Sequence, residues 1–227
     1  MKKLPIGIQT FSKFFKDDYV YIDKTKSIHN LLTTGGQYYF ISRPRRFGKS
    51  LLVSTLKEIF SGNKKLFKNL WIYDKIDWEK HPVIHIDFSN MSYETPGKLR
   101  LSLAREMDRF ASESNLALTQ DADYKTKFGE LIKLLSGENR VVILIDEYDK
   151  PIIDFVEKKD VALENRDILR NFYSILKGSD EYIRFAFLIG VSKFSRVSVF
   201  SGLNNLKDIT MDDRFSTMMG YTQDELE

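Results

Sequence analysis

The stretch from residue 43 to residue 50 constrains the fold of this chain most, because its pattern requires a strand before it and a helix after it. Its residues are Arg43, Pro44, Arg45, Arg46, Phe47, Gly48, Lys49 and Ser50. The last three match the end of the pattern G-x-x-x-x-G-K-[ST], in which backbone N–H groups close around phosphate oxygens. In that pattern the lysine reaches the β- and γ-phosphates and the hydroxyl reaches Mg²⁺. Arg43 stands where the first glycine belongs.

The flanking residues supply the setting that this pattern needs. Residues 37–42 are aromatic and β-branched, which predicts a strand, and residues 50–60 carry apolar side chains at helical spacing. A helix that begins at the loop offers an anion free N–H groups and the positive end of its dipole. We therefore interpret Arg43 to Leu51 as a nucleotide-phosphate cradle. The alternative is an ordinary basic turn between a strand and a helix.

A second motif follows in residues 140–149, where an apolar run ends in Asp146 and Glu147. A strand that is apolar on both faces is typical of a parallel sheet covered on both sides, and ligands bind at the carboxyl ends of such strands. Asp146 is predicted to hold Mg²⁺ together with Ser50, and Glu147 to orient and polarise the attacking water. The alternative is a solvated acidic turn after a buried strand.

The two motifs together resemble those of the AAA-ATPase-like domain family of bacterial proteins, in which SRPRRFGKS is followed by LIDEYDKP. Further matching stretches are residues 4–11, 21–25, 190–195 and 202–206. Arginine at the first loop position is normal in that family, so the resemblance implies ATP binding with Mg²⁺. Family members usually continue into a helical lid and often into a C-terminal PD-(D/E)XK nuclease-like domain. We expect neither in this chain, and interpret residues 221–227 as the start of a truncated lid or C-terminal region.

Strand and helix patterns alternate along the chain. Strands are predicted at 82–88, 140–146 and 183–190, with a short one at 205–210, and helices at 96–115, 123–136 and 164–177, the last capped by Gly178. This alternation predicts an α/β fold with three layers and a parallel sheet. The resemblance implies a P-loop NTPase of the ASCE/AAA-like type with strand order 5-1-4-3-2. We expect residues 1–36 to form an N-terminal strap with a short helix, and residues 37–220 to form the ATPase core.

The implied strand order brings the end of the 183–190 strand between the two motifs. Ser192 is therefore the candidate for sensing the γ-phosphate or the lytic water, as a third catalytic residue beside Lys49 and Glu147. The alternative is a serine that caps a turn. Lys193 and Arg196 are candidates for charge stabilisation. Residues 6–11 and 20–25 are candidates to flank the adenine, and plain packing of their apolar side chains is the competing interpretation.

The composition of the chain excludes several kinds of reactive or metal-binding site. The chain has no cysteine, which excludes disulfides, thiolate metal sites and cysteine nucleophiles, and its three histidines argue against a histidine-rich metal centre. His85, in a strand-like run, is expected to be packed rather than a ligand. No run approaches the ~18 apolar residues of a membrane span, so we expect a cytoplasmic protein. Residues 1–50 hold ten Lys/Arg against three Asp/Glu, which suits a triphosphate and leaves nucleic acid open as a partner.

Three functions follow from these residues. The first is Mg²⁺-dependent ATP binding and hydrolysis by the regulatory part of a larger protein, which the intact Lys49, Asp146 and Glu147 favour. The second is a nucleotide-gated switch that does not hydrolyse ATP, which the missing lid favours. The third is an accessory nucleic-acid-binding module.

Overall fold

The structure of the chain is a computed structural model that describes residues 2–192, 199–200, 203 and 205–227. Two residues that the sequence proposed for charge stabilisation, Lys193 and Arg196, lie outside the described residues.

A five-stranded sheet lies at the centre, with the order β2-β3-β4-β1-β5 and parallel pairing throughout. Its strands are β1 (Tyr38–Ser42), β2 (Val83–Asp87), β3 (Val141–Asp146), β4 (Ile183–Gly190) and β5 (Lys207–Asp208). Counted from the β5 edge, this is the order 5-1-4-3-2, so the α/β fold and the predicted topology are confirmed. β5 is shorter than the strand predicted at 205–210.

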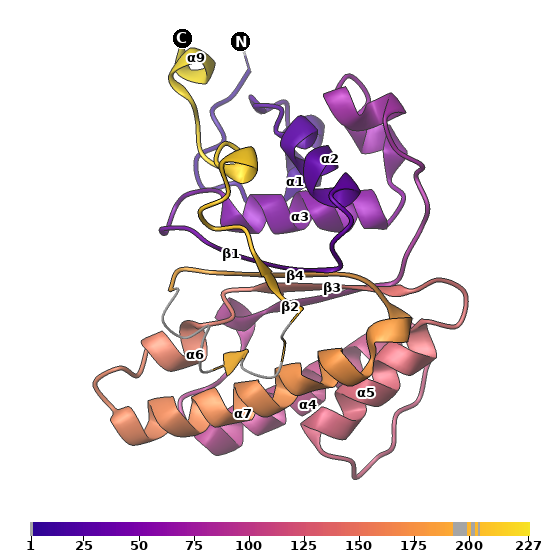
Figure 1. Cartoon of the computed structure of the whole chain (residues 1–227), viewed down its shortest axis with the longest axis vertical. Helices are drawn as coiled ribbons and strands as arrows, with labels where there is room; N and C mark the ends of the chain where they lie inside the picture. Colours follow the sequence, from indigo (N-terminus) through magenta and orange to yellow (C-terminus); the bar gives the residue numbers. More distant parts are fainter. Residues whose placement is uncertain (1, 193–198, 201–202, 204) are drawn as a thin grey trace.

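Helices cover both faces of the sheet and make three layers (Figure 1). One face carries α1 (Phe11–Lys16), α2 (Thr25–Thr33) and α3 (Lys49–Phe60), and the other carries α4 (Pro96–Glu113), α5 (Tyr124–Leu135) and α7 (Lys159–Gly178). The shorter helices are α6 (Lys150–Ile153) and α9 (Gln223–Leu226). Single 3₁₀ turns are η1 (Lys64–Phe67), η2 (Trp71–Asp74), η3 (Phe88–Asn90), η4 (Asp180–Tyr182) and η5 (Asp213–Phe215).

The sheet is buried on both faces, which explains its unbroken apolar strands. Successive side chains of a strand point to opposite faces. In β1, Tyr38 and Phe40 therefore pack with the side chains of α4, α5 and α7, whereas Tyr39 and Ile41 pack with those of α1, α2 and α3. Every residue of β1 and of β3 is buried.

The helix boundaries follow capping chemistry more closely than apolar periodicity. α4 begins after Thr95, whose hydroxyl accepts the Lys98 N–H at 3.3 Å, and α5 begins after Asp123 in the same manner. α7 begins at residue 159 rather than at the predicted 164, because its first turn is exposed or half-buried and so lacks the apolar pattern. The prediction of Gly178 as C-cap was wrong: Gly178 is the last helical residue and Ser179 is the cap.

The N-terminal segment ties together parts of the chain that are distant in sequence. The Asp23 carboxylate accepts the Thr25 N–H at 2.8 Å and the Trp71 N–H at 2.7 Å. Lys24 Nζ lies 2.5 Å from Glu225 Oε2 in α9, so the segment before α2 contacts the C-terminal helix, and both chain ends lie on the same side of the molecule (Figure 1). Within the described ranges, no helix combines the length and the apolar character needed to cross a bilayer.

Candidate functional site

The 43–50 loop joins the end of β1 to the start of α3. Arg46 and Gly48 adopt left-handed backbone conformations, with φ of 65° and 85°. The left-handed region suits glycine because it has no Cβ, and Gly48 is the residue immediately before the first turn of α3. The loop residues Pro44, Arg45, Arg46, Phe47 and Gly48 are exposed, whereas Leu51 is half-buried and packs on the core.

Arg43 anchors the base of this loop instead of lining its rim. Its guanidinium donates from Nη1 to the carbonyl oxygens of Ser42 at 3.0 Å and Thr210 at 2.7 Å. The Thr210 hydroxyl in turn accepts the Ser42 N–H at 3.1 Å. Burial lowers the pKa of Arg43, and nearby Asp208 opposes that shift. A glycine at this position could not make the link to the residues after β5, which gives a physical reason for the departure from the usual loop pattern.

Lys49 lies beneath the loop, with a side chain that is only 6% exposed. Its Nζ donates to the Pro44 carbonyl oxygen at 3.0 Å. Burial lowers the pKa of Lys49, and the carboxylates of Asp146, Glu147 and Asp149 act in the opposite direction. The ammonium is therefore buried within the field of the acidic residues that follow β3.

Asp146 ends β3 and is 1% exposed. Burial raises its pKa from the ordinary value of 3.8 to about 6, the charges of Asp87 and Glu147 add to the rise, and a hydrogen bond from Ser50 opposes it. Asp87 lies beside Asp146 because the two residues are in register on neighbouring strands. The structure thus brings together Ser50 and Asp146, the two residues predicted to bind Mg²⁺.

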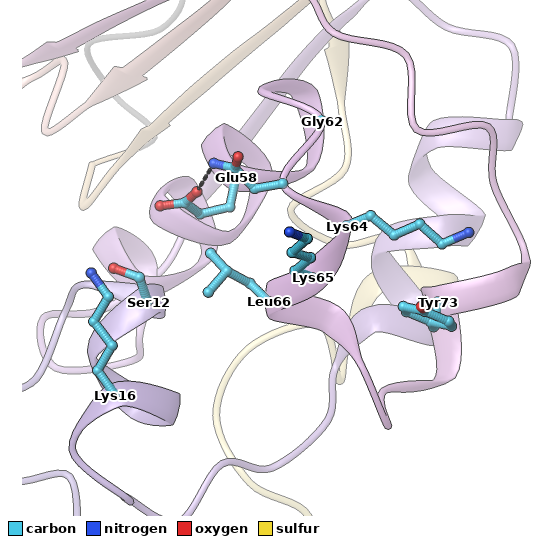
Figure 2. Close-up of a pocket in the computed structure, with 9 residues that line it drawn as sticks. Ser12, Lys16, Glu58, Gly62, Lys64, Lys65, Leu66 and Tyr73 are labelled. Atoms are coloured by element: carbon cyan, nitrogen blue, oxygen red, sulfur yellow. Dashed lines mark hydrogen bonds between the residues drawn. The ribbon is translucent and has the colours of Figure 1, made fainter.

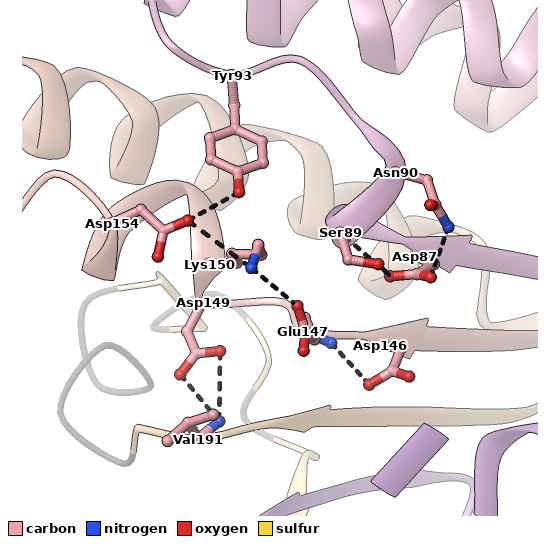
Figure 3. A network of polar contacts seen from close by, with 10 residues as sticks. All are labelled: Asp87, Ser89, Asn90, Tyr93, Asp146, Glu147, Asp149, Lys150, Asp154 and Val191. Atoms are coloured by element: carbon pink, nitrogen blue, oxygen red, sulfur yellow. Dashed lines mark hydrogen bonds and ion pairs between the residues drawn. The ribbon is translucent and has the colours of Figure 1, made fainter. Parts of the chain in front are cut away.

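Glu147 has a left-handed backbone with φ of 53°, which is uncommon for a residue other than glycine. Its N–H donates to Asp146 Oδ1 at 2.9 Å. Its Oε2 is buried, and no hydrogen-bond donor of the described residues reaches it, although Lys150 Nζ lies 3.4 Å away (Figure 3). Strain of this kind persists only where the surrounding structure imposes it, and it is concentrated at functional sites.

Two further residues after β3 hold the end of β4. The buried Asp149 carboxylate accepts the N–H of Val191 at 3.1 Å and that of Ser192 at 2.5 Å. The Tyr148 hydroxyl donates to the Ser192 carbonyl oxygen at 2.6 Å. Burial raises the pKa of Asp149, and the two N–H donors oppose that shift. The backbone of Ser192 is therefore fixed beside the acidic residues, by contacts that the sequence patterns did not reveal.

Gly190, the last residue of β4, is required by this arrangement. A Cβ at Gly190 would lie 2.5 Å from Asp149 Oδ1 and 2.5 Å from the buried Tyr148 ring. We expect Gly190→Ala to destabilise the fold by about 1–3 kcal/mol through overpacking, measured as a lower midpoint in urea unfolding. Gly97→Ala is the matched control, because a Cβ at that helical position meets nothing within 4 Å. Equal midpoints for the two variants would contradict this account.

A small recess of about 10 Å³ opens between the loop and the end of β3, about the size that one water occupies. Its lining residues are Arg45, Glu147, Asp149, Lys150, Ile153 and Val191. Arg45 therefore lies beside Glu147 and Asp149 in this recess, although the 43–50 loop, the residues after β3 and the end of β4 are far apart in sequence.

A larger cavity lies elsewhere and is not part of this site. It measures about 870 Å³ and opens beyond the far end of α3, where Lys16, Lys64, Lys65 and Tyr73 line it (Figure 2). Glu58 of α3 also lines it, and the helix from Lys49 to Glu58 spans about 14 Å. Its lysines are all exposed, and Lys64 Nζ lies 4.8 Å from the centroid of the Tyr73 ring.

Of the residues predicted to flank adenine, some are packed in the core and others are exposed. Phe11 is fully buried and stacks on Phe67 at 4.6 Å between ring centroids, and Tyr21 packs against Phe11 edge-on. Plain packing is thus confirmed for Phe11 and Tyr21. Ile6 is 87% exposed, so the packing interpretation is wrong for that residue.

His85 is half-buried in β2, as expected for a packed side chain. Burial lowers the pKa of His85, whose Nε2 is buried without a hydrogen-bond partner among the described residues. Among all the residues that the structure describes, no group of three or more His, Asp or Glu side chains is arranged to hold a metal ion.

The chain matches a known protein family and is similar to a known protein. The family described as Predicted AAA-ATPase matches residues 5–200. The chain is also similar to an uncharacterized protein in the vnfD 5′ region of Azotobacter chroococcum mcd 1, with 48% identity over 230 residues. That similarity covers 100% of this chain and 44% of the relative, so the chain spans less than half of the relative's length.

Proposed function

The chain belongs to the family of predicted AAA-ATPases, and from that membership we propose that it binds ATP with Mg²⁺ and hydrolyses it to ADP and phosphate. The observation that carries the proposal is the meeting of buried Lys49, buried Asp146 and strained Glu147 at the carboxyl edge of the sheet. Burying charges is costly unless they are compensated. A polyphosphate with a divalent cation would supply that compensation for both signs of charge.

The 43–50 loop would bind the phosphates. Its backbone N–H groups and the N-terminus of α3 offer donors and a positive dipole end. Lys49 would neutralise the β- and γ-phosphates, and Arg45 would reach the γ-phosphate from the recess that it lines with Glu147. Arg43 would act on the same loop by holding its base to Thr210.

Ser50 and Asp146 would hold the Mg²⁺. This ion takes oxygen ligands and is usually bound by one or two protein groups together with substrate phosphates, which fits a hydroxyl and a carboxylate that already contact each other. When bound, Mg²⁺ neutralises the charge that develops on the phosphates. The raised pKa of Asp146 fits the same role, because a nearby cation would stabilise its ionised form.

Glu147 would activate water in the adjoining recess. The water oxygen attacks the γ-phosphorus while its proton passes to the Glu147 carboxylate, and the bond from the γ-phosphorus to the bridging oxygen breaks to release ADP. Ser192 is proposed as the group that contacts the γ-phosphate or this water, because Asp149 and Tyr148 fix its backbone beside the recess.

The wider role is also a proposal. Since the chain spans less than half of its relative, we propose that ATP binding here controls the activity of a larger protein. We also propose that the protein acts in the cytoplasm, where ATP is available. A switch that holds ATP without hydrolysing it would use the same loop and remains the alternative.

Lys49→Ala tests the nucleotide site directly. Loss of the buried ammonium removes a charge-assisted contact worth about 1.5–3 kcal/mol, so affinity for ATP with Mg²⁺ should fall about 10- to 100-fold. Isothermal titration of ATP with Mg²⁺ present measures this. Lys57→Ala, on an exposed part of the same helix, serves as the control and should bind as the wild-type chain does. Equal affinities for both variants would refute the proposed phosphate site.

A further inference from the structure

Lys150, the first residue of α6, lies between two carboxylates. Its Nζ is 3.4 Å from Glu147 Oε2 and 3.9 Å from Asp154 Oδ2 (Figure 3). The three side chains are each only about 27–31% exposed. The Lys150 ammonium therefore lies near two carboxylates. Glu147 is the proposed base, whereas Asp154 does not line the recess.

The second carboxylate already has a donor. The Tyr93 hydroxyl donates to the same Asp154 Oδ2 at 2.8 Å. Tyr93 lies on the segment between β2 and α4, and Asn165 donates to its carbonyl oxygen at 3.1 Å and to that of Pro151 at 2.8 Å. Because Tyr93 occupies the oxygen that Lys150 would approach, it weakens the attraction of Asp154 for the ammonium.

The first carboxylate depends on Lys150. Glu147 Oε2 is buried and receives no hydrogen bond from the described residues, so the ammonium is its nearest compensating charge. Both residues also line the 10 Å³ recess. A Glu147 carboxylate held by the Lys150 ammonium keeps the orientation that the ion pair imposes, so it is less free to turn towards a water in the recess.

We propose that Lys150 is a positioning residue that sets the availability of Glu147 as a base. When Lys150 pairs with Glu147, it restrains the Glu147 carboxylate. When Lys150 pairs with Asp154, the Glu147 carboxylate is free to turn towards the recess. Tyr93 adjusts this balance through its hydrogen bond to Asp154. This inference rests on the proposed hydrolysis.

Three substitutions test it because they should change turnover in opposite directions. Lys150→Met removes the restraint, and Tyr93→Phe frees Asp154 to attract Lys150, so both should raise kcat for phosphate release. Asp154→Asn removes the competing acid and should lower kcat. Each change should be about two- to fivefold, as expected for a partly exposed ion pair, with KM for ATP unchanged within about twofold. Lys150→Arg should restore values close to wild type.

A purely structural role predicts a different result. If all three substitutions lower kcat, or if Tyr93→Phe and Asp154→Asn shift it in the same direction, the inference is overturned. Phosphate release by Lys150→Met from a chain whose wild-type form releases none would support it. If neither releases phosphate, the inference fails, whereas ATP binding that is lost only in Lys49→Ala would still support the nucleotide site.

Discussion

Glu147→Gln is expected to bind ATP and Mg²⁺ as tightly as the wild-type chain and to release phosphate at least about 100-fold more slowly. The amide has the size and shape of the carboxylate but cannot accept a proton from water. General-base catalysis contributes typically 10²- to 10⁴-fold to a rate, so its loss should dominate the kinetics. Single-turnover phosphate release and equilibrium ATP titration measure the two effects separately.

The control for this experiment is Glu157→Gln, an exposed acid beyond α6 that should leave both quantities unchanged. The result also separates the two candidate functions. If the wild-type chain and Glu147→Gln both bind ATP and neither releases phosphate, the non-hydrolysing switch is correct. If both release phosphate at the same rate, Glu147 is neither the base nor a source of charge that the reaction needs.

The elements around this site differ in how far their sequence predicts them. The apolar run that ends at Asp146 predicted β3 and its interior place, because burial on both faces removes polar residues from the strand. The loop pattern requires glycine at position 48, and Gly48 has a left-handed conformation that few other residues adopt at low cost. In both cases the physical demand falls on the residue itself, so local sequence is enough.

Contacts between distant segments leave no such local mark. Arg43 bonds to a carbonyl 167 residues away, and Asp149 accepts N–H groups 42 and 43 residues away. Asp149, two residues after the acidic pair, was visible in the sequence, but its partners are backbone groups that any residue could provide. The left-handed conformation of Glu147 was equally hidden, since nothing in a glutamate indicates positive φ.

Asp146→Asn is expected to stabilise the fold and to remove Mg²⁺-dependent nucleotide binding. The pKa of Asp146 rises from 3.8 in its ordinary state to about 6 in the folded chain, mainly through burial. The folded chain therefore holds this proton more tightly than the unfolded chain does. Ionising the group at neutral pH costs about 2–3 kcal/mol of folding free energy. A neutral amide avoids that cost, so the melting temperature at pH 7 should rise by about 4–10 °C.

The pH dependence gives the decisive comparison. For a group with a raised carboxyl pKa, stability increases as pH falls from about 6 towards 4, because the folded state takes up the proton first. The wild-type chain should show this contribution, Asp146→Asn should lack it, and the exposed Asp121→Asn should keep it. Protons and Mg²⁺ compete for the same carboxylate, so Mg²⁺-dependent ATP binding by the wild-type chain should weaken below about pH 6. A variant that melts at a lower temperature than wild type at pH 7 would show instead that the ionised Asp146 is compensated within the fold, and that its buried charge does not depend on a bound cation.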